Sequence, residues 1–134
     1  MPHLTGVLWS DTPALWAHVK PLIDSAAIRS GGRFMADDYF DAIFSQKQQL
    51  WLAWEGDEIV AVCITEIINY PKKRVLNIPV LAGHQIERWV GFLRHIEAWA
   101  KSEGCRKIEM SGRKGWRKIL DDWLETGVIL EKDI

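Results

Sequence analysis

The chain has 134 residues, of which 48% are hydrophobic and 26% are charged, and its formal net charge is -1. We expect one domain with a single core over residues 1–134, because a chain of this size and composition buries enough apolar surface to fold without disulfides or metals. The charge argues against a protein that wraps nucleic acid, and no stretch resembles a membrane span or a secretory signal. A cytoplasmic location without a membrane partner follows as the expectation.

The cysteine and tryptophan residues predict a packed interior. Cys63 and Cys105 lie in apolar, strand-like runs without a Cys or His at metal-ligand spacing. They are expected to be buried, reduced thiols, and no metal site is predicted. The eight Trp residues should fill the core, and an exposed subset would mark a partner surface. Whether the chain forms an oligomer is left open.

The first part of the chain predicts two helices and three strands. A helix within residues 11–30 follows an Asp and a Pro at helix-start positions and is bent or interrupted at Pro21. A second helix is expected in "ADDYFDAIFSQK", after a Gly pair. The runs "LWLAW", "EIVAVCITEII" and "VLNIPVL" are rich in β-forming residues and are joined by short turns, so three neighbouring antiparallel strands are expected.

The second part predicts a crossover to a parallel strand. Apolar residues from Ile86 to Ala100 form one helical stripe that ends before Gly104, a typical C-terminal cap. The strand "CRKIEMS" follows, so residues 75–81 and 105–111 should be parallel neighbours. A last helix over about residues 114–124 and a closing strand "GVILEKDI" complete the prediction, which is an α/β (α+β) domain with a mixed sheet flanked by helices.

This element order resembles the GCN5-related N-acetyltransferase (GNAT) fold over nearly the whole chain. The fragments "QLWLAW", "WAKSEGCRKIE" and "GRKGW" together look most like small GNAT-like proteins of bacteriophages and prophages. In this family the strand before the crossover helix carries a bulge and splays from the next strand, and acetyl coenzyme A (acetyl-CoA) enters the wedge. Pro79 fits such a bulge, and it fits an edge strand as well.

The resemblance also implies where a coenzyme would bind. The family's pyrophosphate loop reads Arg or Gln, two residues, Gly, one residue, then Gly or Ala, whereas this chain has "VLAGHQIERW" with Gly83 alone. The dipole of a helix that starts near Gln85 would still favour an anion. The residues expected to meet the coenzyme are Val80, Leu81, Gly83, His84, Gln85, Arg113 and Trp116.

Catalytic groups are less complete than in the family. The tyrosine that serves as general acid there corresponds to Trp123, which donates no such proton, and Tyr39 and Tyr70 lie in the first half of the chain. For a base we consider Glu66, Asn77 and Glu109, which interrupt apolar strands, and prefer Glu66, because burial would suit a carboxyl group to base catalysis. A solvated Glu66 at a strand end is the alternative, as is His84 as the base.

The turn "SGRKGW" admits two interpretations. Gly112 and Gly115 permit a tight strand-to-helix turn in which Arg113 and Lys114 meet an anion, or the turn is purely structural with solvated cations. Two functions remain. One is an acetyl-CoA-dependent N-acyltransferase with a small-molecule or protein amine as acceptor. The other is a non-catalytic GNAT-like phage protein, located in the host cytoplasm or the virion, that binds another protein.

Overall fold

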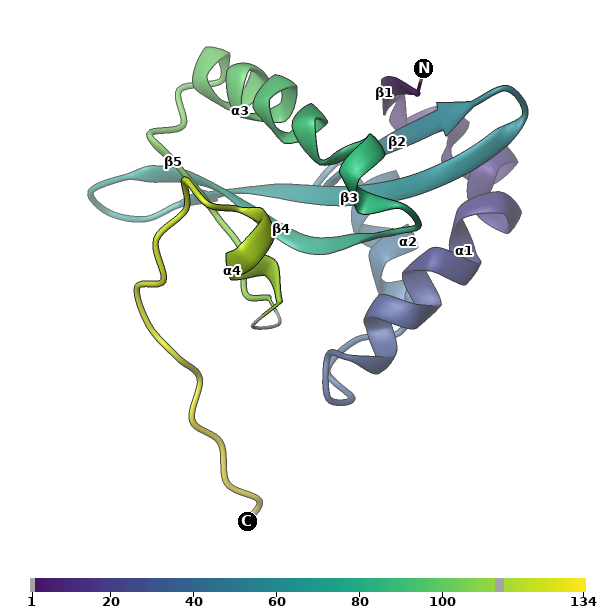
Figure 1. The fold of residues 1–134 in the computed structure, drawn as a ribbon. Helices are drawn as coiled ribbons and strands as arrows, with labels where there is room; N and C mark the ends of the chain where they lie inside the picture. Colours follow the sequence, from purple (N-terminus) through teal and green to yellow (C-terminus); the bar gives the residue numbers. More distant parts are fainter. Residues whose placement is uncertain (1, 113–114) are drawn as a thin grey trace.

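A computed structural model describes residues 2–112 and 115–134 as a five-stranded sheet with helices on both faces (Figure 1). The strand order is β1-β2-β3-β4-β5. The first four strands are antiparallel neighbours, and β5 is parallel to β4. The predicted fold class is confirmed.

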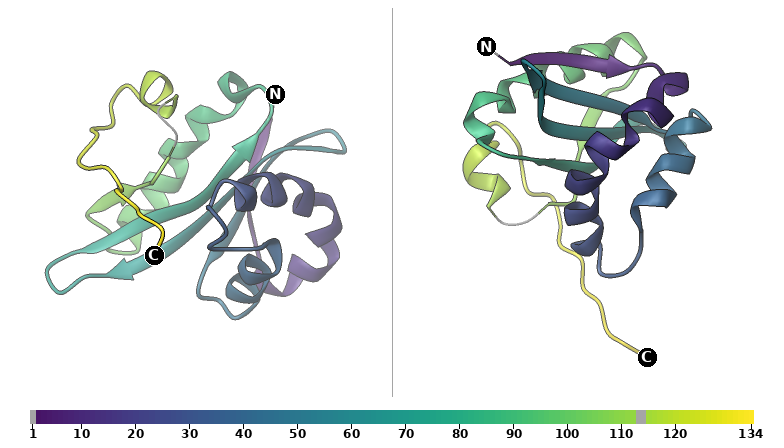
Figure 2. Two further views of the ribbon diagram at one scale, coloured as in Figure 1. Left: turned by 90° about the horizontal axis from the view of Figure 1, so that it is seen from below. Right: turned by 90° about the vertical axis from the view of Figure 1, so that its right-hand side faces the viewer.

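Two helices cover one face of the sheet, as the second view of Figure 2 shows. They are α1 (Thr12–Ile28), which follows the 3-10 turn η1 (Trp9–Asp11), and α2 (Ala36–Phe44). The N-terminus of α2 is capped by Asp38, whose Oδ2 accepts a hydrogen bond from the Met35 N–H at 2.8 Å. Buried aliphatic side chains of α1 and α2 pack against those of β2, β3 and β4 and form one half of the core.

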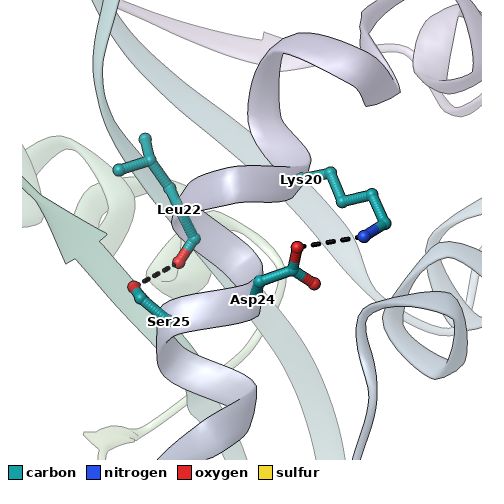
Figure 3. A network of polar contacts seen from close by, with 4 residues as sticks. All are labelled: Lys20, Leu22, Asp24 and Ser25. Atoms are coloured by element: carbon teal, nitrogen blue, oxygen red, sulfur yellow. Dashed lines mark hydrogen bonds and ion pairs between the residues drawn. The ribbon is translucent and has the colours of Figure 1, made fainter.

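Helix α1 continues through Pro21, so the predicted interruption there is wrong. Pro21 is exposed, and on the same helix Lys20 forms an ion pair of 2.9 Å with Asp24 (Figure 3). The Ser25 hydroxyl donates to the Leu22 carbonyl at 2.8 Å. A proline removes one helical N–H donor, and packing of the opposite face against the sheet offsets that loss.

The predicted antiparallel strands are present as β2 (Gln49–Glu55), β3 (Glu58–Asn69) and β4 (Arg74–Gly83). An additional strand, β1 (His3–Val7), pairs with β2 at the edge of the sheet and was not predicted. Its sequence, HLTGV, contains a glycine and no regular alternation, so it gives little strand signal. Gly6 packs against the Trp51 ring, where a Cβ atom would lie 3.2 Å from the nearest ring carbon.

The other face of the sheet carries α3 (Leu93–Ser102) and the short α4 (Trp116–Ile119). The predicted crossover helix therefore begins later than expected, because two 3-10 turns, η2 (Ile86–Arg88) and η3 (Val90–Phe92), precede α3. Its C-terminal end agrees with the prediction, since Gly104 has a φ of +86°. After the crossover comes β5 (Lys107–Glu109).

The second half of the core lies beneath α3 and α4 and contains both cysteines. Cys63 and Cys105 are buried free thiols, as predicted. Burial raises the pKa of the Cys63 thiol, so this group stays protonated. Trp89 is buried, whereas Trp9 is 38% exposed. In residues 2–112 and 115–134, no helix is long and apolar enough to cross a bilayer.

The C-terminal part differs from the prediction. Helix α4 has four residues, and no closing strand forms in residues 121–134. The final segment leaves the body of the molecule in Figure 1. Trp123 packs against the core beneath α3, Glu125 forms an ion pair of 3.0 Å with Arg117 of α4, and Glu131 forms an exposed ion pair of 2.9 Å with Arg33. Such a pair contributes at most about 1 kcal/mol, whereas ordering the backbone costs roughly 1–2 kcal/mol per residue. Contacts within one chain therefore do not hold this segment as a strand.

The buried and exposed faces of α1 predict different losses of folding stability for substitutions at two of its isoleucines. Ile23 is 0% exposed and Ile28 is 81% exposed. We expect Ile23→Ala to lower the free energy of unfolding by about 2–5 kcal/mol, because it leaves a cavity in the core. The matched variant Ile28→Ala should change it by no more than about 0.5 kcal/mol. Urea denaturation measures both, and equal effects would contradict the assignment of the buried helix face.

Candidate functional site

A bulge in β4 shapes the part of the sheet next to β5. Ile64 lies opposite Val80 and Glu66 opposite Asn77, so two residues of β4, Ile78 and Pro79, face the single residue Thr65 of β3. The bulge predicted at Pro79 is confirmed.

Strands β4 and β5 diverge directly beside this bulge. Their parallel pairing ends at Asn77 and Glu109, whereas β4 continues to Gly83. Within the described residues, β4 beyond Asn77 pairs only with β3, so one backbone edge of β4 faces the space between the diverging strands. The predicted parallel pair that separates toward its C-terminal ends is present.

Four polar side chains cross the sheet where the strands diverge, and we call them the polar row: Gln48, Glu66, Asn77 and Glu109. Glu66, Asn77 and Glu109 are register partners on β3, β4 and β5, so they point to the same face of the sheet. This is the face that α1 and α2 cover, because Ile64 and Val80 lie in the core beneath those helices.

Glu66 is the carboxylate that accepts hydrogen bonds from two other members of the row. Its Oε2 accepts a hydrogen bond of 3.0 Å from Gln48 Nε2, and its Oε1 accepts one of 2.8 Å from Asn77 Nδ2. Glu66 is half-buried, so neither the fully buried nor the solvated reading of this residue describes it. A carboxylate has about four acceptor positions, so Glu66 retains capacity for a further donor. Gln48 Oε1 is buried without a described hydrogen-bond partner and adds another acceptor here.

Two tyrosines approach the row. The Tyr70 hydroxyl donates to Glu109 Oε1 at 3.1 Å, and this hydrogen bond, together with the Glu109 charge, raises the Tyr70 pKa. Tyr39 of α2 is buried, and its pKa is raised first by burial and then by the charges of Asp38 and Glu66. Both phenols therefore remain protonated at neutral pH. Gln48 and Tyr70 are not among the site residues expected from the sequence, because no local pattern places a turn residue beside a distant strand.

The turn that follows β4 differs from the expected anion cradle. Regular helix begins at Leu93, so the prediction of a helix N-terminus near Gln85 is wrong. The His84 N–H donates to the Val60 carbonyl at 2.9 Å, and the His84 carbonyl accepts from Trp89 Nε1 at 2.8 Å. Gln85, with a φ of +52°, accepts from Arg88 at 2.6 Å. The polar groups of this turn are thus largely engaged in hydrogen bonds within the fold.

The other residues expected to meet a coenzyme occupy different settings. Val80 is buried beneath α1 and α2, and Leu81 is half-buried on the opposite face. Gly83 is required by packing, since a Cβ atom there would lie 2.5 Å from the Val60 carbonyl oxygen. Trp116 begins α4, and its ring meets that of Trp89 edge-on at 6.5 Å. Arg113 and Lys114 lie outside the described residues.

Sequence comparisons found no counterpart: no family model matches the chain, and no curated protein matches it. Solved structures do match over almost the full length. A "GCN5-related N-acetyltransferase" from Ralstonia eutropha covers 99% of this chain and 99% of its own, with a TM-score of 0.72 and 15% identity.

Two further structures agree. A "predicted acetyltransferase with acetyl-CoA" from Clostridium acetobutylicum has a TM-score of 0.70 and 17% identity, and covers 99% of this chain and 96% of its own. Glucosamine-6-phosphate N-acetyltransferase from Arabidopsis thaliana has a TM-score of 0.67 and 14% identity, with 99% and 98% covered. Likeness at these identities concerns the fold. The chain has the fold of the GCN5-related N-acetyltransferases.

Proposed function

We propose that this protein transfers an acyl group from a coenzyme A thioester, acetyl-CoA first among them, to an amine. The main support is one observation: among the described residues, β4 beyond Asn77 pairs only with β3, so its other backbone edge is open from the polar row onward. The pantetheine arm of coenzyme A is extended and carries amide groups, so it can pair with this edge as a strand would. The thioester would then lie beside Asn77 and Glu109.

In this proposal Glu66 is the general base. The amides of Gln48 and Asn77 hold its two oxygens, at 3.0 and 2.8 Å, and leave acceptor capacity for an ammonium. A fixed base next to a bound thioester lowers the barrier mainly by positioning the reactants. Gln48 and Asn77 act through Glu66 and are positioning residues.

The proton balance of the reaction needs a second group. The amine nitrogen forms a bond to the acyl carbon and the carbon–sulfur bond breaks, so two protons leave the ammonium in total. Glu66 accepts one of these protons and passes it to solvent. The second balances the proton that the departing thiolate receives. We assign the donor role to Tyr70, which already donates to Glu109 and keeps its proton at neutral pH. The resemblance in sequence assigns Trp123 to the position of the family's tyrosine, and Trp123 is half-buried in the core beneath α3.

The acceptor in this proposal is a small-molecule or protein amine. Among solved structures with this fold, one is an aminoglycoside acetyltransferase from a soil metagenomic sample in complex with sisomicin, with a TM-score of 0.69 and 12% identity, and another acetylates glucosamine-6-phosphate. Both of those acceptors are small amines. The carboxylates Glu66 and Glu109 suit a positively charged amine in the same way.

One observation favours a second candidate, a non-catalytic protein of this fold that binds another protein. Around the turn where a pyrophosphate would bind, His84 and Gln85 are engaged in internal hydrogen bonds, and Arg88 forms an ion pair with Glu55. The resemblance to small bacteriophage proteins belongs to this candidate, as a component of the virion or of a host interaction.

Calorimetry with acetyl-CoA separates the two candidates. The first candidate predicts saturable binding, weakened roughly tenfold or more by Arg113→Ala, because removing a charge-assisted contact costs about 1.5–3 kcal/mol. His84→Ala should cost less, since the His84 side chain is exposed and its backbone N–H is already paired with Val60. Absence of binding at millimolar coenzyme would rule out the acyltransferase and leave the protein-binding candidate.

Steady-state kinetics of the Glu66→Gln variant test the assignment of Glu66 as the general base. We expect kcat to fall by about two to four orders of magnitude, the usual contribution of a general base, while coenzyme affinity stays within a factor of about two. Glu103→Gln, at the exposed end of α3, is the matched control and should behave as the unmodified protein. Full turnover by Glu66→Gln would remove Glu66 from the mechanism.

A further inference from the structure

A cleft of about 640 Å³ lies between α1 and the end of the sheet where β2 turns into β3. Helix α1 contributes Leu15 and His18, and the two strands contribute Leu52, Trp54 and Ile59. Small-molecule sites in proteins have volumes of about 300–1,000 Å³ and are lined mainly by apolar side chains with a few polar groups. The cleft therefore has the size and lining of a ligand site.

A second β-bulge shapes the apolar part of this cleft. Ala53 pairs with Ala61, and the next residue of β2, Trp54, pairs with Ile59, so Val60 is an extra residue of β3. Ala53, Val60 and Ala61 pack together in one cluster of the core. Trp54 and Ile59 instead pack beside the core that α1 and α2 cover. The bulge thus places an indole ring and an aliphatic side chain next to each other on the cleft side of the sheet.

The Trp54 ring is held in place without a ligand. Its Nε1 donates to Thr5 Oγ1 at 2.8 Å, and the His3 ring stacks against it with the ring centroids 4.7 Å apart. Both partners belong to β1. A side chain that is already fixed loses little conformational freedom when a ligand binds, and the face of an indole ring attracts a cation.

Acidic residues lie at the rim of the cleft. Asp57 and Glu58, in and next to the turn between β2 and β3, both line it. Neither carboxylate has an ion pair or side-chain hydrogen bond within residues 2–112 and 115–134, whereas the nearby Glu55 pairs with Arg88. None of the described residues that line the cleft is Lys or Arg. The local charge therefore favours a cation and disfavours an anion.

We propose that this cleft binds an organic cation with an apolar body, of the arylalkylamine class. The apolar body contacts Trp54 and Ile59, and the ammonium group lies toward Asp57 and Glu58. Ile59 stands seven residues before Glu66 on β3, so roughly 23 Å of strand separates the cleft from the polar row. The cleft is a second site, and the inference is independent of the proposed acyltransferase activity.

A pair of probes with opposite charge tests the ligand class. Phenethylamine and hydrocinnamate share an aromatic ring and a two-carbon chain, but the first carries an ammonium group and the second a carboxylate. A proton–nitrogen NMR spectrum of the isotope-labelled full chain reports the Trp54 indole N–H, which is identified by its loss in Trp54→Phe. Phenethylamine should shift this signal saturably, and hydrocinnamate should bind at least about tenfold more weakly. Equal binding of both probes, or no saturable shift at about 10 mM phenethylamine, overturns the proposal.

Charge-removing variants test the position of the ammonium group. Asp57→Asn combined with Glu58→Gln should weaken phenethylamine binding by about fivefold or more, and Asn is well tolerated in a turn. The matched control, Asp121→Asn with Asp122→Asn, removes two exposed charges that do not line the cleft and should leave the affinity unchanged.

Glu66→Gln separates the cleft from the polar row, and it too should leave the shift of the Trp54 signal unchanged. Equal weakening by the two double variants would mean that only the net charge matters. Weakening by Glu66→Gln but not by the Asp57 and Glu58 variant would place the probe at the polar row. Either result overturns the proposal.

Discussion

The bulge at Ile78 and Pro79 is the constraint on which the rest of the sheet depends. Two residues of β4 face Thr65 alone, which shifts the alternation of β4 by one position. Asn77 before the bulge and Val80 after it therefore point to the same face, one beside Glu66 and the other into the core. Two side chains of β2 fix the Thr65 hydroxyl: Trp51 Nε1 donates to it at 3.0 Å, and it donates to Gln49 Oε1 at 2.8 Å. Pro79 has no N–H group to offer a neighbouring strand, so pairing with β5 stops just before it.

Much of the fold could be predicted because its signals are local. The strand runs of β2, β3 and β4, the second helix and the cap at Gly104 depend on residue type and spacing within short windows. The elements that differ depend on distant contacts. Strand β1 has a weak pattern and exists through pairing with β2. Residues of the apolar stripe from Ile86 do pack into the core, but Trp89, with a φ of −133°, separates two 3-10 turns, and its Nε1 donates to the His84 carbonyl.

The site shows the same division between local and distant information. Glu66, Asn77 and Glu109 stood out in the sequence as polar residues in apolar strands, and the sheet register brings them together. Gln48 and Tyr70 carry no such signal, because their contacts with the row join turn residues to strands far along the chain. The expected coenzyme turn shows the limit of resemblance: a shared fold does not transfer the hydrogen-bonding state of a loop.

The sheet register also has a consequence for the order in which the molecule folds. Asn69 and Arg74 pair across a short hairpin, so the loop that must close before β3 and β4 meet is small. Val75 and Lys107 are 32 positions apart and are joined by the whole crossover. Closing that longer loop costs more chain entropy before any contact compensates for it. The hairpin should therefore form before the pairing of β4 with β5, and the opening between these two strands follows it.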